Sequence, residues 1–217
     1  MNLTTDSRSS RQGIPGHYDT FLEVFTQATA MVREDYLQLP VAGREDPLYR
    51  ERVYCYELYH RLRLTMDNSI LRFRYMLCGE LDKSGHPYIR GDSLDGVKPD
   101  FLVHVPLSMT DNLVAIEVKP VTRIIQDEAG TGAVRRRVIR QGEIEKDLRT
   151  LTAFRKVGKY LHAIYLIYGN DDRGFQHIRA KAAFLSNKLG TKKIDLGLID
   201  LYLHRESGQP ASHQVWL

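Results

Sequence analysis

The sequence predicts an α/β chain of the α+β class, in which a mixed central sheet is flanked by helices. Three short apolar runs follow one long amphipathic helix with no helical pattern between them, and a second helix and a further apolar run come next. That further run, residues 161–168, is apolar almost without interruption, which is typical of a central strand covered on both faces. The 217 residues, 42% of them hydrophobic, are enough for one domain with a real core.

The elements can be assigned in order along the chain. Residues 1–16 are rich in Ser, Thr, Arg, Gly and Pro, so we expect a flexible N-terminal arm and a single domain over 17–217. Apolar residues at three- and four-residue steps predict helices over 17–39 and 48–71. The following elements are then predicted: strands at 75–81, 101–105 and 113–118, a flexible basic loop at 126–142, a helix at 143–157, the strand at 161–168, a helix at 175–189 and a last strand at 194–203.

Composition excludes several classes of protein. No apolar run reaches the 18 or so residues that span a bilayer, and the polar N-terminus lacks the apolar core of a secretion signal, so we expect a cytoplasmic protein with no membrane partner. Cys55 and Cys78 lie in apolar segments, which predicts buried thiols rather than a disulfide. The net charge is +4, but residues 155–193 hold nine Lys or Arg against two Asp, which favours a polyanionic partner.

Acidic residues fall at particular places in the predicted strands. Glu117 and Lys119 share one face of a strand that is otherwise apolar, and Asp100 opens the strand before it. Antiparallel pairing through the turn at 107–112 would bring the Asp100 carboxylate near Glu117. Two carboxylates and a main-chain carbonyl, that of Val118, offer the hard oxygen ligands of Mg²⁺, and Mn²⁺ fits the same set. Lys119 would orient or deprotonate a water, or neutralise charge on phosphorus.

These residues form a motif that resembles the PD-(D/E)XK nuclease superfamily, also called the restriction-endonuclease-like fold. Lys-Pro-Asp at 98–100 is followed, after sixteen residues, by Glu-Val-Lys at 117–119. The resemblance covers about residues 48–169 and implies a core of helix, three antiparallel strands, helix and strand. The helix at 17–39 and the C-terminal helix and strand would be additions to that core. The implied activity is that of a metal-dependent endo- or exodeoxyribonuclease, in restriction, phage defence, mobile-element processing or repair.

The resemblance also implies a role for each residue of the site. Asp100 and Glu117 would be metal ligands, with Mg²⁺ as the cofactor and Mn²⁺ as its substitute, and Lys119 would be the catalytic lysine. Superfamily members often add a glutamate from the helix before the first strand. Glu57 occupies that place as a catalytic and metal-binding residue, and Glu80 is the alternative.

Structural explanations compete with these roles. Glu117 and Lys119 would also form a solvated ion pair on a strand face, and Asp100 would also suit a strand start after proline. Glu57 precedes Arg61 by four residues, the spacing of a helix salt bridge.

Basic residues are the candidates for contact with DNA. Four arginines fall within six residues of the predicted loop, and a second basic set follows on the helix at 175–189. The predicted nucleic-acid-binding residues are Arg135, Arg136, Arg137, Arg140, Arg179 and Lys181.

Two other functions stay open at this stage. The first is a non-catalytic module of the same fold that binds nucleic acid or protein through its basic surface. The second is a nuclease that acts on RNA or branched DNA, which charge alone does not distinguish from one that cuts duplex DNA. A homodimer would permit double-strand cuts, and a larger multi-protein complex is the other expected assembly.

Overall fold

The computed structural model describes residues 16–42, 48–79, 98–108, 111–126 and 134–217, with the backbone alone for 123–126 and 134–138. The helices are α1 (His17–Ala30), α2 (Glu34–Leu37), α3 (Glu51–Asp67), α4 (Gln141–Lys156) and α5 (Asp172–Leu189), with short 3₁₀ helices η1 (Ile70–Phe73) and η2 (Leu196–Leu198). The strands are β1 (Met76–Gly79), β2 (Phe101–His104), β3 (Asn112–Pro120), β4 (Thr122–Gln126), β5 (Val134–Val138), β6 (Tyr160–Tyr168), β7 (Asp200–His204) and β8 (Ser212–Gln214).

Within these residues, six strands form one open mixed sheet in the order β1-β2-β3-β6-β7-β8. The first three strands pair antiparallel, as predicted from the sequence. After α4, strand β6 joins β3 in parallel and β7 joins β6 in parallel, while β8 returns antiparallel along β7. The predicted α+β class with a mixed sheet between helices is therefore confirmed.

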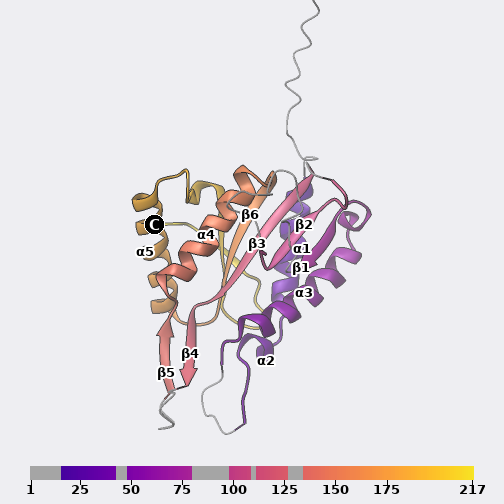
Figure 1. Ribbon diagram of the computed structural model, residues 1–217. Coiled ribbons are helices and arrows are strands. Elements are labelled where there is room, and N and C mark those ends of the chain that lie inside the picture. Colours follow the sequence, from indigo (N-terminus) through magenta and orange to yellow (C-terminus); the bar gives the residue numbers. More distant parts are fainter. Residues whose placement is uncertain (1–15, 43–47, 80–97, 109–110, 127–133) are drawn as a thin grey trace, which may run out of the picture.

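Helices cover the sheet on both faces, α1 and α3 on one and α4 and α5 on the other (Figure 1). Strand β6 shows why its sequence is almost uninterruptedly apolar. Ile164 and Leu166 belong to the core under α1 and α3, whereas Tyr165 and Ile167 belong to the core under α4 and α5. This two-sided burial confirms the predicted central strand.

Several predicted boundaries differ from the structure. The helix expected over 17–39 is divided, because α1 ends at Ala30 and the chain turns before α2. The last strand begins at Asp200, because residues 196–198 form a 3₁₀ turn first. Strand β8 was not predicted, since three largely polar residues give no alternating signal. The predicted N-terminal arm lies outside the described residues apart from Gly16.

The prediction of a basic loop over residues 126–142 was wrong for its second half. Residues 134–138 form β5, which pairs antiparallel with β4 in a two-stranded ribbon, placing Arg136 opposite Ile124 and Arg135 opposite Ile125. Three consecutive arginines hide the period-two alternation by which strands are recognised. The ribbon leaves the domain below α5, at the end of the sheet where β3 terminates (Figure 1).

Both cysteines are free thiols, as predicted, but only Cys55 is buried and Cys78 is half-buried. In the part of the chain that the structure describes, no helix combines the length and the apolarity needed to cross a membrane.

A close backbone contact fixes the direction in which β3 passes into the ribbon. Val121 donates its N–H to the carbonyl of Tyr168 at 2.8 Å, and the first turn of α5 packs against it at Gly174. A Cβ at Gly174 would lie 2.5 Å from the Val121 carbonyl oxygen and 3.0 Å from Cγ2 of Thr122. Only glycine fits between these elements without a shift of backbone.

Replacing Gly174 by Ala should lower the free energy of unfolding by about 1–3 kcal/mol, because the new methyl group overlaps backbone that cannot swing away. Gly142→Ala in α4 is the control, since a Cβ there contacts nothing within 4 Å. This control should be neutral or stabilising by up to about 1 kcal/mol. Urea unfolding followed by circular dichroism measures both variants, and equal destabilisation of the two would contradict the packing argument.

Candidate active site

Asp100 and Glu117 are brought together by the register of β2 and β3. Phe101 pairs with Ile116 and Leu102 with Ala115, so the next cross-strand pair on the Leu102 face is Asp100 and Glu117. The two carboxyl groups interact directly, and Oδ2 of Asp100 accepts the N–H of Val118 at 2.7 Å. The antiparallel neighbourhood predicted from the sequence is therefore present.

Lys119 lies one pleat beyond Glu117 on the same face of β3, and its side chain is buried. Its Nζ is 3.1 Å from Oδ2 of Asp147, which comes from α4. The same Nζ is 3.0 Å from Oε2 of Glu51, which opens α3. The same Oδ2 of Asp147 also accepts the hydroxyl of Tyr165, at 3.3 Å. A lysine from the sheet is thus clamped by acids from both helical layers.

Sequence reasoning missed Glu51 and Asp147, although each leaves a signal. Asp147 follows Ile144 by three residues and precedes Leu151 by four, so it occupies the apolar stripe of α4. Glu51 occupies the corresponding stripe of α3, four residues before Cys55. A charged residue on the buried face of an amphipathic helix needs a partner inside the fold, and here the partner is Lys119.

Burial controls the protonation of this cluster. Burial raises the pKa of Asp100 to about 7 and that of Asp147 to about 6, and it raises the pKa of Glu117 well above its ordinary value. Burial alone would lower the pKa of Lys119, but the carboxylates of Asp147 and Glu51 hold it above its usual range. Four acids therefore share the Lys119 ammonium, and the cluster favours an added positive charge, either protons or a cation.

The donor set fits a small hard cation such as Mg²⁺. Asp100 and Glu117 supply carboxylate oxygens on neighbouring strands. In an extended strand the N–H and the C=O of one residue point to the same side. Asp100 accepts the N–H of Val118, so the carbonyl of Val118 also points toward the Asp100 side of β3. No three His, Cys, Asp or Glu side chains among the described residues are arranged to hold an ion by themselves. Mg²⁺ does not require such a group, because it binds through one or two carboxylates and keeps several waters.

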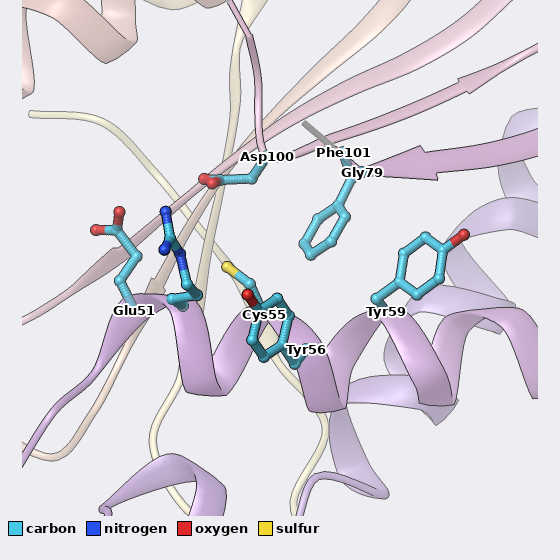
Figure 2. Close-up of a pocket in the computed structure, with 8 residues that line it drawn as sticks. Glu51, Cys55, Tyr56, Tyr59, Gly79, Asp100 and Phe101 are labelled. Atoms are coloured by element: carbon cyan, nitrogen blue, oxygen red, sulfur yellow. The ribbon is translucent and has the colours of Figure 1, made fainter. Parts of the chain in front are cut away.

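A pocket of about 460 Å³ opens beside the cluster. Glu51 and Asp100 lie at one end and Tyr59 at the other, with Cys55 and Tyr56 between them along α3 (Figure 2). Two acids of the cluster, Glu51 and Asp100, therefore border a space that a ligand can enter. The pocket is lined by Glu51, Arg52, Cys55, Tyr56, Tyr59, Gly79, Asp100 and Phe101.

Glu57, predicted as an auxiliary metal-binding residue, does not join the cluster. Its Oε1 pairs with Arg61, at 2.7 Å from Nε and 2.6 Å from Nη2, which is the helix salt bridge that the sequence offered as the alternative. The acid that α3 contributes is Glu51, six residues earlier. Glu80 lies outside the described residues.

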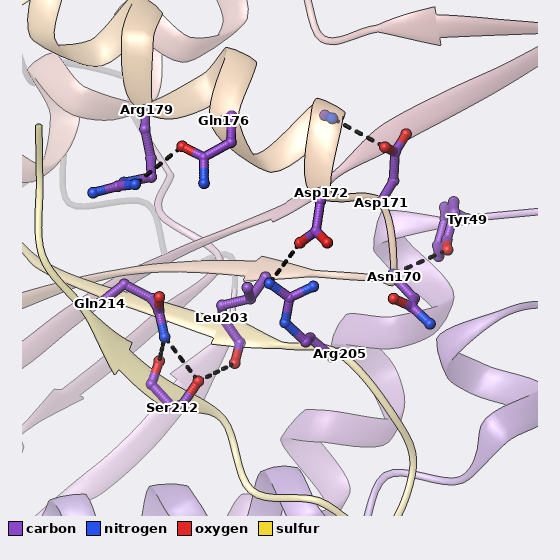
Figure 3. Close-up of polar contacts among 11 residues, drawn as sticks. Tyr49, Asn170, Asp171, Asp172, Gln176, Arg179, Leu203, Arg205, Ser212 and Gln214 are labelled. Carbon is purple, nitrogen blue, oxygen red and sulfur yellow. Dashed lines mark hydrogen bonds and ion pairs between the residues drawn. The ribbon is translucent and has the colours of Figure 1, made fainter.

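The predicted DNA-binding residues fall into two groups. Arg135, Arg136 and Arg137 lie on β5, and Arg140 is exposed at the start of α4, all after the end of β3 that bears the cluster. Arg179 instead fastens the C-terminal segment, because its guanidinium donates to the carbonyl of Val215 and to Gln176. Figure 3 shows the contact of Arg179 with Gln176, which lies one turn earlier on α5. The Lys181 ammonium lies 5.8 Å from the ring centre of Phe184 on the same helix.

Comparisons of the chain with family models, with curated proteins and with solved structures found no match. Function therefore has to be inferred from the chemistry of the cluster. Buried acids that favour an added cation, at the mouth of a pocket and next to a basic ribbon, suit an anionic ligand held through that cation and a reaction in which negative charge develops.

Without metal, the stability that Asp100 contributes should be lost as the pH rises from about 4 to about 8. The folded-state pKa of Asp100 is raised from 3.8 to about 7, so folding favours the protonated acid. Its contribution is complete below pH 4 and lost as the pH rises through 7, at most about 4 kcal/mol at about 1.4 kcal/mol per pKa unit. Urea unfolding at pH 5 and pH 8 in EDTA measures this loss.

Asp100→Asn is the control for this loss, because it stays neutral and should lose less stability than the wild type between pH 5 and pH 8. The comparison cancels the contributions of His162 and His204, whose lowered pKa values of about 4 act in the opposite direction. Excess Mg²⁺ at pH 8 should restabilise the wild type and not the variant. Identical pH profiles of the two proteins would contradict the assignment of a buried acid here.

Proposed function

We propose that the protein is a divalent-metal-dependent nuclease that hydrolyses phosphodiester bonds of DNA and that its core has the restriction-endonuclease-like topology. The observation that supports this most strongly is the convergence of Asp100, Glu117 and Lys119 beside an open pocket. Apart from the β4–β5 ribbon, which follows β3, the order α3, β1, β2, β3, α4, β6 is the one that the superfamily resemblance implies. Two strands supply the acids and the lysine, and two helices hold the lysine in place.

The residues that would hold the ion are Asp100 and Glu117, together with the carbonyl of Val118. A bound Mg²⁺ or Mn²⁺ would supply Lewis-acid chemistry, polarising a phosphoryl oxygen and lowering the pKa of water. The carboxylates also orient the group that enters between them, since Asp100 is fixed by the Val118 N–H at 2.7 Å. A preorganised acid of this kind needs little rearrangement when the reaction begins.

Lys119 supplies the positive charge that phosphoryl transfer requires as negative charge grows on the phosphate oxygens. Its ammonium is held within 3.1 Å of both Asp147 and Glu51, so it reaches the site in one defined position. These two acids keep its pKa above the usual range, which means that it remains protonated across physiological pH. We assign Glu51 and Asp147 as positioning residues.

The basic ribbon supports a nucleic acid as substrate. Strand β4 begins at Thr122, three residues after Lys119, so the ribbon starts from the same end of the sheet as the cluster. A two-stranded ribbon fits the major groove of duplex DNA, and arginine binds phosphate with paired hydrogen bonds. The backbone of the substrate would therefore be gripped next to the site of cleavage.

Glu117→Gln, Asp100→Asn and Lys119→Met should each lower metal-dependent cleavage at least about 100-fold, because each removes a group that acts on the reacting phosphate. Glu57→Gln is the matched control on α3, since its carboxylate is bound to Arg61 away from the pocket, and it should cleave as the wild type does. Purified proteins would be incubated with single- and double-stranded DNA, circular and linear, and with RNA, in EDTA, Mg²⁺ or Mn²⁺.

A folded Glu117→Gln protein that still cleaves would refute the site. Salt-sensitive DNA binding by the wild type without any scission would identify instead a non-catalytic binding module, and cleavage confined to RNA would replace the proposed substrate.

Replacing Arg135, Arg136 and Arg137 together by Ala should weaken DNA binding and reduce its salt dependence. Each lost phosphate contact lowers the slope of log K against log salt by about 0.9 for duplex DNA. The control replaces Lys188, Lys192 and Lys193 by Ala, which removes the same charge from exposed positions in the last turn of α5 and just beyond it. Equal losses from the two triple variants would show that net charge matters and the ribbon does not.

A further inference from the structure

The pocket beside the cluster has two chemically different ends. Five of its residues come from one face of α3: Glu51, Arg52, Cys55, Tyr56 and Tyr59. At a rise of 1.5 Å per residue, Glu51 and Tyr59 are about 12 Å apart along the helix axis. Over that length the lining changes from carboxylates to aromatic rings, as Figure 2 shows.

The aromatic end is held in a fixed geometry. The ring of Tyr59 lies nearly parallel to that of Phe101, with their centres 6.3 Å apart, and its hydroxyl donates to the carbonyl of Leu77 at 3.4 Å. Tyr56 is on the same helical face and is 64% exposed, so its ring is presented to whatever enters. A ring that is already ordered, as that of Tyr59 is, binds a planar ligand with little loss of entropy.

We propose that this pocket binds an unpaired nucleobase of the substrate strand, adjacent to the phosphate that the acidic cluster cleaves. This proposal rests on the proposed nuclease function and specifies its substrate as unpaired DNA: single strands, frayed ends or flaps. Bases stack on aromatic side chains irrespective of sequence, because every base has a π face. The phosphate of the same nucleotide would then lie toward Asp100 and the exposed Arg52.

The size of the pocket favours one strand over two. A volume of about 460 Å³ is in the range of sites for small organic ligands, which accommodates a nucleotide and excludes a stacked pair of strands. The pocket also depends on a missing side chain, that of Gly79 at the end of β1. A Cβ there would lie 3.6 Å from the carbonyl oxygen of Asp100 and 3.7 Å from the Tyr59 ring, so a larger side chain would fill the cavity.

The test measures binding before cleavage. Fluorescence of short oligonucleotides that carry 2-aminopurine, in EDTA, reports stacking of a base on protein rings without any chemical step. We expect Tyr56→Leu and Tyr59→Leu each to weaken binding of the single strand by about 5- to 150-fold, the range for loss of one base–aromatic stack. Gly79→Val should weaken it similarly by filling the pocket, and affinity for blunt duplex should change less than twofold.

Phe73→Leu is the matched control, because Phe73 is an aromatic residue that is 77% exposed and lies outside the pocket. It should leave both affinities unchanged. Equal losses for single strand and duplex in the pocket variants, or no loss in any of the three, would overturn the base-binding assignment. If stacking occurs as expected but no metal supports cleavage, the base-binding assignment is supported and the nuclease function is refuted. The binding and cleavage experiments therefore test the two proposals separately.

Discussion

The Lys119 ammonium links all three layers of the domain. It comes from β3 in the middle of the sheet, and its two partners come from opposite faces, Glu51 from α3 and Asp147 from α4. A buried ion pair is a poor source of stability, because desolvating the charges offsets most of their attraction. Its structural effect is positional. It fixes the start of α3 and the middle of α4 against the end of β3, and with them the wall of the pocket.

Burial of apolar side chains offsets the desolvation cost of this charged site. Strands β3 and β6 are buried along most of their length, and each face contributes its own cluster of aliphatic and aromatic side chains. Each fully buried large apolar side chain contributes about 1.5–3 kcal/mol, so a few such residues compensate for one strained group of acids. Raised acid pKa values are expected where function, rather than stability, has selected the residues.

The sequence predicted the order of elements well and the site in part. Alternation along 113–119 and the apolar run at 161–168 are strong local signals, and both strands were found where expected. Glu117 and Asp100 were paired correctly because antiparallel register follows from a short connection. Glu57 was predicted and Glu51 was missed, because which acid of a helix reaches the end of β3 depends on how that helix is placed against the sheet, which no local pattern records. Asp147 lies 28 residues after Lys119, and only tertiary contact joins them.

The edges of the sheet determine how copies of this chain can meet. The outermost strands, β1 and β8, have four and three residues, so each offers few unpaired backbone donors and acceptors to a neighbour. Short edges of this kind give little template for strand addition. The six-stranded sheet is therefore protected, at its described edges, from the propagating, fibre-like stacking that long bare margins invite.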